Sequence, residues 1–252
     1  MRYQLTASEA EFYETTFVPA LFAAWAQRLI DAVRPQPGES VLDVACGTGA
    51  VARLASELAG PVVGLDLNES MLAVARKITP SVHWQQGDAC ALPFPPASFD
   101  VVLSQAALMF VDDRVLALRE MGRVSRGRIA VQVPGRLSAS AGYRPLAEVV
   151  ARHADPALLG AYFAVGSPSV LRGLFEDAGL TVDDFVTWTG ATRLDSLETF
   201  LAVELLPVAD RVSPAVRERI VDECRVAMAP FVDPSGAVAA PIEVHLVLGH
   251  RS

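Results

Sequence analysis

The stretch Val41–Ala55, VLDVACGTGAVARLA, decides the fold class of this chain. A short apolar run ends at two glycines, Gly47 and Gly49, after which apolar residues recur at helical spacing. This strand, turn and helix pattern is typical of proteins that bind a nucleotide-type cofactor, and GTGAVA also satisfies the loose G-x-G-x-x-G/A dinucleotide pattern. By itself the stretch leaves open both a nicotinamide cofactor and another adenosine-bearing cofactor.

Short apolar runs alternate with helical patterns along the rest of the chain. The further strand-like runs are PVVGLDL, SVHWQQG, FDVVLSQ, GRIAVQV, TVDDFVTWTG and PIEVHLVLG. Helices are expected at 51–58, 69–78 and 112–124, and later at 196–206 and 213–228. This alternation predicts an α/β fold: a doubly wound, Rossmann-like, mostly parallel sheet of seven strands with helices on both faces. Ligands of such sheets lie beyond the carboxyl ends of the strands.

The 252 residues predict a single domain, 1–252, with additional segments around the sheet. Apolar residues at helical spacing between Glu11 and Val33 predict one or two amphipathic helices within an N-terminal segment, 1–36. The irregular segments 136–166 and 195–232 are interpreted as helical cap insertions over the site. Because they are rich in Ala, Leu, Val and Phe, we expect them to form an apolar pocket.

Composition and charge exclude several classes of partner. A hydrophobic fraction of 52% with 20% charged residues describes a globular protein, and a net charge of −8 disfavours a nucleic-acid substrate. Three dispersed cysteines, Cys46, Cys90 and Cys224, fit neither a disulfide framework nor a zinc cluster, so no metal and a cytoplasmic location are expected. We find no secretory signal and expect no membrane span. The oligomeric state stays open.

Two carboxylates lie at or near the ends of the first two predicted strands. Asp43 lies just before the glycine loop, where a bound pyrophosphate would be repelled, whereas a cofactor bearing an ammonium and a sulfonium would be attracted. At ~5 Å and an effective dielectric constant of ~20 this Coulomb energy is roughly 3 kcal/mol. Asp66 ends the second strand, where a carboxylate can accept hydrogen bonds from both ribose hydroxyls.

The glycine loop itself supplies three candidate residues. Gly47 and Gly49 would let the backbone approach a ligand with no Cβ in the way, and Thr48 can offer a hydroxyl. The alternative is a tight strand-to-helix turn without a ligand.

The stretch GDACALPFPPASFDVVLSQ, from Gly87 to Gln105, separates the two classes of cofactor. Asp88 follows the third strand and can accept from an exocyclic adenine amine, while Ala89 stays small beside the ring. Gln105 ends the fourth strand, near the expected amino-acid part of the cofactor. Because dinucleotide enzymes need no comparable residues at these places, the stretch favours an adenosyl cofactor.

Together VLDVACGTG, GLDLNESML, GDACALPF, SFDVVLSQ and FEDAGL resemble a class I S-adenosylmethionine-dependent methyltransferase. The similarity is to the small-molecule group related to the ubiquinone and menaquinone biosynthesis methyltransferases (methyltransferase type 11), and it covers mainly residues 41–133. It implies that Asp43, Ala45 and Gly47 line the methionine end, that Asp66 holds the ribose, and that Leu67 and Met71 pack on the adenine. Asp88 and Ala89 would edge the adenine, with Gln105 closing the pocket.

The resemblance also implies that the N-terminal helices form a lid. Tyr13 and Phe17 are the candidates to close on the cofactor, against the alternative that aromatic residues at helical spacing are core. In the first cap segment, His153 is the candidate general base, and Tyr143, Arg144 and Tyr162 are candidate contacts to the substrate.

The implied reaction is transfer of the sulfonium methyl to an oxygen, nitrogen or carbon of a hydrophobic small molecule, such as a quinone, polyketide or other secondary metabolite. Orientation and exclusion of water can contribute ~7–11 kcal/mol, so no conspicuous catalytic dyad is needed. Two alternatives remain. One is an S-adenosylmethionine-binding protein that catalyses a non-methylating reaction such as cyclisation, and the other is an NAD-dependent oxidoreductase.

Overall fold

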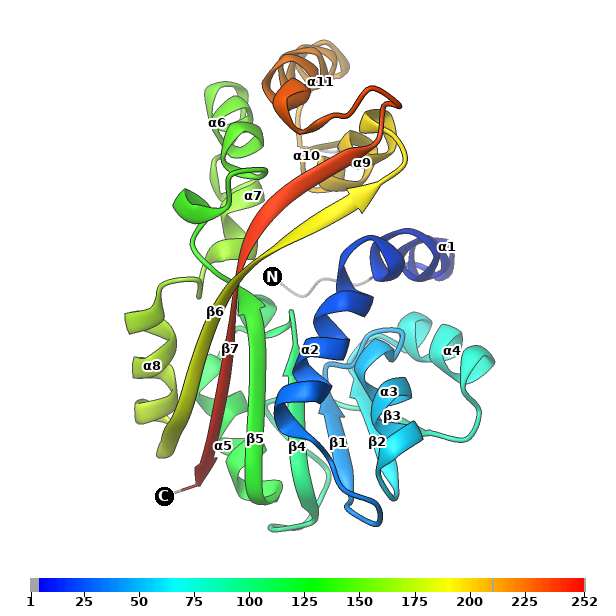
Figure 1. The fold of residues 1–252 in the computed structure, drawn as a ribbon, viewed down its shortest axis with the longest axis vertical. Helices are drawn as coiled ribbons and strands as arrows, with labels where there is room; N and C mark the ends of the chain where they lie inside the picture. The colour runs from blue at the N-terminus through cyan, green and yellow to red at the C-terminus, as the bar shows by residue number, and fades with distance from the viewer. Residues whose placement is uncertain (1–4, 210, 252) are drawn as a thin grey trace. The chain divides into compact units, whose positions relative to one another are not determined.

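A seven-stranded sheet with the order β3-β2-β1-β4-β5-β7-β6 forms the centre of the computed structural model (Figure 1), which describes residues 5–209 and 211–251. Pairing is parallel between β1 and β2, β1 and β4, β2 and β3, and β4 and β5. The prediction of a seven-stranded, mostly parallel α/β sheet is confirmed. The strands are β1 (Val41–Val44), β2 (Val62–Asp66), β3 (His83–Gln86), β4 (Phe99–Gln105), β5 (Ser125–Pro134), β6 (Leu180–Leu194) and β7 (Val238–Arg251).

Strand β1 lies inside the sheet, between β2 and β4, and all four of its residues are buried. The register sets Asp43 beside Gly64 on one side and Leu103 on the other. The carboxyl ends of parallel strands lie at the same end of the sheet, which is called the carboxyl edge below. The glycine loop, Asp66 and Gln105 therefore lie together at this carboxyl edge.

Strand β3 is an outermost strand of the sheet and pairs only with β2. His83 of this strand is exposed, and only Trp84 is buried among the four residues of β3.

Side-chain caps explain where two of the helices between the strands begin. Asn68 Oδ1 accepts from the backbone N–H groups of Ser70 and Met71, and the helix begins at Glu69 as expected. Asp113 caps the next long helix through the N–H of Leu116. Four of the helices between the strands are α3 (Ala50–Leu58), α4 (Glu69–Ile78), α5 (Arg114–Val124) and α8 (Pro168–Asp177).

The N-terminal helical region begins earlier than the apolar spacing indicates. Thr6 and Glu9 form a capping box, so helix α1 covers Ala7–Phe12. A π-helical stretch, η1 (Tyr13–Phe22), follows and contains Pro19, and α2 (Ala23–Val33) completes the region. π-Helical structure is rare and is frequently found at functional sites.

The chain divides into two compact units, each described here by itself. Unit 1 comprises residues 1–133, 168–186 and 245–252, and unit 2 comprises 134–167 and 187–244. The cap segments 136–166 and 195–232 fall in unit 2, whose longer helices are α6 (Arg144–His153), α9 (Leu197–Glu204) and α11 (Pro214–Met228). The short helices of unit 2 are α7 (Ala157–Gly160) and α10 (Leu206–Ala209).

Helix α6 lies where the sequence pattern was interpreted as irregular. Its buried residues Leu146, Val149 and Val150 recur at helical spacing, and Pro145 suits a first turn. Helix α11 begins as expected, because Ser213 accepts from the N–H of Val216.

No single helix among the described residues has the length and apolar composition of a membrane span. One interrupted pair, Ala157–Phe163 with Pro168–Asp177, meets that length and composition test when the two helices are taken together. Within the described ranges, no group of three or more His, Cys, Asp and Glu side chains is arranged to hold a metal ion.

Candidate cofactor site

The loop between β1 and α3 bends through several left-handed residues. Ala45, Gly47 and Gly49 have φ values of 55°, 56° and 89°. For alanine this conformation is strained, and such strain is concentrated at functional sites. The loop is held in place by the N–H of Cys46, which donates to Leu65 O at 3.0 Å.

The two glycines of the loop have different roles. A Cβ on Gly49 would lie 2.2 Å from Cη2 of Trp84, so packing at this position requires glycine. The expectation that Gly47 and Gly49 let the backbone approach a cofactor stays a prediction. A Cβ on Gly47 would lie 3.9 Å from Cε1 of Tyr13, so Gly47 faces the N-terminal helices.

Asp43 is buried, with 1% of its surface exposed, and its Oδ2 accepts from the N–H of Ala52 at 3.0 Å. Burial raises the pKa of Asp43 to about 8, and the nearby Asp66 carboxylate also raises it, while the Ala52 N–H acts in the opposite direction. Without a cation beside it, Asp43 is therefore largely protonated at pH 7. The expected attraction to a sulfonium or ammonium requires the ligand itself to favour ionisation.

Asp66 connects the end of β2 to the glycine loop. Its Oδ2 accepts from the N–H of Gly47 at 2.7 Å, and its Oδ1 accepts from the N–H of Asn68 at 2.8 Å. Burial raises the pKa of Asp66, and these backbone N–H donors partly counteract the increase. Each carboxylate oxygen can accept a second bond, so the group retains capacity for a ribose diol.

The residues expected around adenine follow β2 and β3. Asp88 Oδ1 accepts from the N–H of Cys90 at 2.8 Å, which forms a tight turn with Ala89 inside it. Met71 is buried in a cluster with Ala10 and Val74, and Leu5 and Tyr13 pack against that cluster.

Leu67, which follows β2, is connected to β3 through its backbone carbonyl. Its carbonyl accepts from Nε2 of Gln86 at 3.1 Å. The residues after β2 and β3 thus form a contiguous stretch of the site.

Aromatic rings of the N-terminal helices lie over the glycine loop. The ring of Tyr13 stacks on Phe17 and Phe22 with centroids 5.6 Å and 5.4 Å apart. Burial and the neighbouring Asp66 carboxylate both raise the pKa of Tyr13. Figure 1 shows α1 beyond the ends of β1 and β2. The structure therefore brings Tyr13 together with Gly47 and Asp66.

Polar contacts fix these helices to the rest of unit 1. Glu14 Oε1 pairs with Nη2 of Arg53 at 3.0 Å, and Nη1 of Arg53 donates to Thr48 O at 2.8 Å. Nδ2 of Asn68 donates to Leu5 O at 3.0 Å. The lid candidates are thus linked to the glycine loop through one guanidinium.

Several buried polar atoms near this edge have no hydrogen-bond partner in the described part of the chain. They are Trp25 Nε1, Thr48 Oγ1, Gln105 Oε1 and Gln132 Oε1. Buried polar atoms are usually paired, so each of these atoms retains the capacity to bond to a ligand or to water. Gln132 was not anticipated, although it interrupts the apolar run RIAVQV.

The residues proposed for substrate contact lie in unit 2, and Tyr162 is close enough to Tyr143 to help raise its pKa. The hydroxyl of Tyr143 is buried and donates to Glu204 Oε1 at 2.7 Å, with Thr192 Oγ1 also in contact. Burial raises the pKa of Tyr143, and it raises the pKa of Glu204 to about 7. Arg144 is exposed and lies 3.7 Å from Glu148. Tyr162 is half-buried in a 3-10 turn.

His153 contacts an acidic partner within unit 2. Its Nε2 lies 2.7 Å from Glu223 Oε1, and the same glutamate pairs with Arg152 at 2.7 Å. One ring nitrogen is therefore engaged in an ion network. Its role as a general base stays a prediction.

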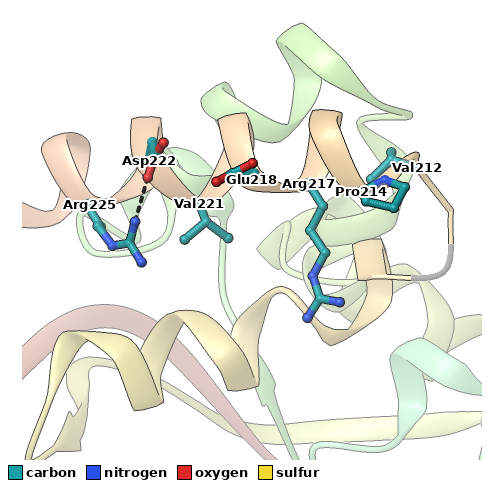
Figure 2. Close-up of a pocket in the computed structure, with 7 residues that line it drawn as sticks. All are labelled: Val212, Pro214, Arg217, Glu218, Val221, Asp222 and Arg225. Atoms are coloured by element: carbon teal, nitrogen blue, oxygen red, sulfur yellow. Dashed lines mark hydrogen bonds and ion pairs between the residues drawn. The ribbon is translucent and has the colours of Figure 1, made fainter.

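A separate pocket of about 340 Å³ lies along α11 in unit 2 (Figure 2). Arg225 on this helix pairs with Asp222 and, at 2.8 Å, with Glu198 of α9. None of the residues that line the pocket belongs to the predicted site; they are Val212, Pro214, Arg217, Glu218, Val221, Asp222 and Arg225.

Comparison with known proteins agrees with this geometry. The methyltransferase domain family matches residues 42–130. The ubiquinone/menaquinone biosynthesis C-methyltransferase UbiE of Hahella chejuensis is 33% identical over 201 residues, covering 66% of this chain and 76% of that protein. The demethylmenaquinone methyltransferase of Renibacterium salmoninarum is 39% identical over 109 residues, covering 42% and 46%. The chain thus spans about half the length of some curated relatives.

A solved structure shows the same fold over most of the chain. The YcgJ protein of Bacillus subtilis superposes with a TM-score of 0.65 at 22% identity, covering 90% of this chain and 98% of that one. This similarity shows the fold, and the identity to the Hahella relative, of which 76% is covered, identifies the family. The chain belongs to the S-adenosylmethionine-dependent methyltransferases of class I.

Proposed function

We propose that this protein transfers a methyl group from S-adenosylmethionine to an oxygen, nitrogen or carbon of a hydrophobic small molecule, such as a quinone, polyketide or other secondary metabolite. The observation that carries the proposal is Asp66, which ends β2 and is bonded to the glycine loop beneath Tyr13. The names of the relatives support a quinone-like acceptor, since two of them are called quinone methyltransferases.

The residues at the carboxyl ends of the strands each have a role in the proposed reaction. Asp66 accepts from the ribose hydroxyls, and Asp43 favours the positive charge at the methionine end. Thr48 and Gln105 supply the unpaired oxygens for the ammonium. The bound cofactor supplies a sulfonium methyl that is already electrophilic. Tyr13 and Phe17 exclude water from the reacting atoms.

The acceptor is assigned to the apolar cap segments, 136–166 and 195–232. Tyr143, Arg144 and Tyr162 are its proposed contacts, and His153 is the proposed base for an acceptor that needs deprotonation. A net charge of −8 supports a small-molecule partner rather than a nucleic acid. The free cysteines support a cytoplasmic location.

Calorimetric titration with S-adenosylmethionine and, separately, NADH tests the proposal. We expect micromolar binding of S-adenosylmethionine and at least a tenfold loss in Asp66→Ala, because bonds to a charged group contribute ~1.5–3 kcal/mol each. Asp31→Ala, which removes an exposed carboxylate from α2, is the matched control and should bind normally.

Transfer of isotopically labelled methyl to a panel of hydrophobic phenols and quinols then tests the reaction. Binding without any methylated product would favour the non-methylating alternative. Binding of NADH alone would overturn the assignment of the cofactor.

A further inference from the structure

Two glutamine side chains lie next to each other at the ends of adjacent strands. Gln105 on β4 and Gln132 on β5 are register partners, so their side chains project from the same face of the sheet. Gln132 has no exposed surface. Both amides donate to the N-terminal helices, Gln105 Nε2 to Phe22 O at 3.1 Å and Gln132 Nε2 to Trp25 O at 3.2 Å.

These two bonds fix how each amide is turned. A backbone carbonyl can only accept, so the nitrogen of each amide must face it and the oxygen must point elsewhere. Both oxygens are buried, and neither has a hydrogen-bond partner among the described residues. A buried acceptor without a donor is costly, so the pair is complementary to a group that carries O–H or N–H.

The strand order indicates which molecule supplies that donor. Neighbouring strands lie about 4.8 Å apart, and the order β2-β1-β4-β5 sets Gln132 two strands beyond the glycine loop, on the side away from Asp66. In the proposed function, the cofactor has its adenosine over β2 and its methionine end toward β4. Strand β5 therefore lies beyond the cofactor, on the side where an acceptor meets the methyl group.

Aromatic rings adjoin the two glutamines. Phe22 and Trp25, whose carbonyls hold the amides, pack edge to face with centroids 5.9 Å apart. Apolar walls with a few fixed polar groups are typical of sites for small hydrophobic ligands.

We propose that Gln132, next to the cofactor contact Gln105, forms a subsite that recognises an O–H or N–H group on the methyl acceptor. The inference rests on the proposed function and narrows its substrate class to hydrophobic molecules with a hydrogen-bond donor. Gln132 is the specificity-determining member, and the carbonyl of Trp25 positions its amide. Access requires movement of the N-terminal helices, which also cover the glycine loop.

Binding of two matched probes tests the subsite in the full chain saturated with S-adenosylhomocysteine. 1-Naphthol carries a donor, whereas 1-methylnaphthalene has nearly the same shape and none. Ligand-observed NMR should show that the wild type binds 1-naphthol about tenfold more tightly, because the second probe leaves a buried oxygen unpaired. Equal affinities, or no binding of 1-naphthol up to its solubility limit, would overturn the proposal without any variant.

The near-isosteric Gln132→Met then assigns the effect to one residue. We expect the preference for 1-naphthol to fall to within about twofold, while Gln36→Met, which removes an exposed amide that donates to Arg34 O, leaves it unchanged. An unchanged preference in Gln132→Met would contradict the proposal, as would an equal loss of affinity for S-adenosylhomocysteine, which would assign the donor to the cofactor. Failure of the proposed function differs from all of these, since the wild type would then bind no S-adenosylmethionine.

Discussion

At the scale of single residues, Gly38 and Gly49 share one backbone conformation and differ in their surroundings. Their φ values are 90° and 89°. A Cβ on Gly38 would have no heavy atom within 4 Å, whereas a Cβ on Gly49 would collide with Trp84. An alanine at Gly38 would therefore be destabilised by backbone strain alone, whereas an alanine at Gly49 would be destabilised by the same strain and by a steric clash.

We expect Gly38→Ala to lower the free energy of unfolding by about 1–2 kcal/mol, from backbone strain alone. Gly49→Ala should lower it by a further 1–3 kcal/mol or so, because the Trp84 ring must move. Urea denaturation measures both. Equal losses in the two variants would show that the ring yields at no cost.

Asp43 makes the stability of the free protein depend on pH. Burial in the folded chain raises the pKa of Asp43 from its ordinary value of 3.8 to about 8. Between these pH values the folded state keeps a proton that the unfolded state releases. The free energy of unfolding therefore falls as pH rises through this window, by up to about 1.4 kcal/mol per pH unit.

Asp43→Asn keeps an acceptor for the Ala52 N–H but cannot titrate. Urea denaturation between pH 5 and 8 should give a flatter profile for this variant than for the wild type. Asp31→Asn, on the exposed face of α2, should keep the wild-type slope. An unaltered slope in Asp43→Asn would mean that Asp43 is not the group responsible.

At the scale of elements, the N-terminal helices and the glycine loop are connected by Arg53. Its guanidinium contacts Glu14 of the π-helical stretch and the Thr48 carbonyl, and the Arg53 and Glu14 side chains are 20% and 18% exposed. A second pair, Lys77 with Glu11, is 69% and 61% exposed. Since exposed pairs contribute little, the first pair should dominate the attachment of the lid.

Glu14→Gln should raise the dissociation rate of S-adenosylmethionine about two- to fivefold, because it loses the ion pair alone. Arg53→Met should raise it about tenfold, because it also loses the bond to the loop. Stopped-flow displacement measures these rates. Glu11→Gln is the control, and a similar increase in that variant would show that the effect is general electrostatics.

At the scale of the whole molecule, the chain passes between the two units four times. The crossings follow Val133, Ser167, Val186 and Val244. Strands β6 and β7 each continue from one unit into the other. Because unfolding of either unit would release strand residues of the other, we expect the chain to unfold as the single domain that its length predicts.

Differential scanning calorimetry should therefore give one transition. S-Adenosylmethionine at about 100 times its Kd should stabilise the folded state by about 2.7 kcal/mol and move that transition upward by roughly 5–10 °C. Two transitions, of which the cofactor moves only one, would show that the units unfold independently.

Local chemistry explains how much could be predicted from the sequence. The apolar run before Gly47, the Asn68 cap of α4 and the carboxylate of Asp66 are each encoded within a few residues, so their elements and their edge of the sheet were predicted correctly. The segment 136–166 was interpreted as a helical cap insertion, but the bounds of helix α6 within it were not predicted.

The sequence by itself determined the alternation of strands and helices, the family and the carboxylates at the strand ends, since periodicity and turn chemistry act over short distances along the chain. Only the tertiary structure decided that Trp84 requires Gly49 and Gly64 to lack side chains, that Tyr13 lies over Gly47, and that Gln132 is a buried, unpaired acceptor. Those facts depend on which strands become neighbours. Neighbouring strands are chosen by burial over the whole sheet, which no short stretch of sequence contains.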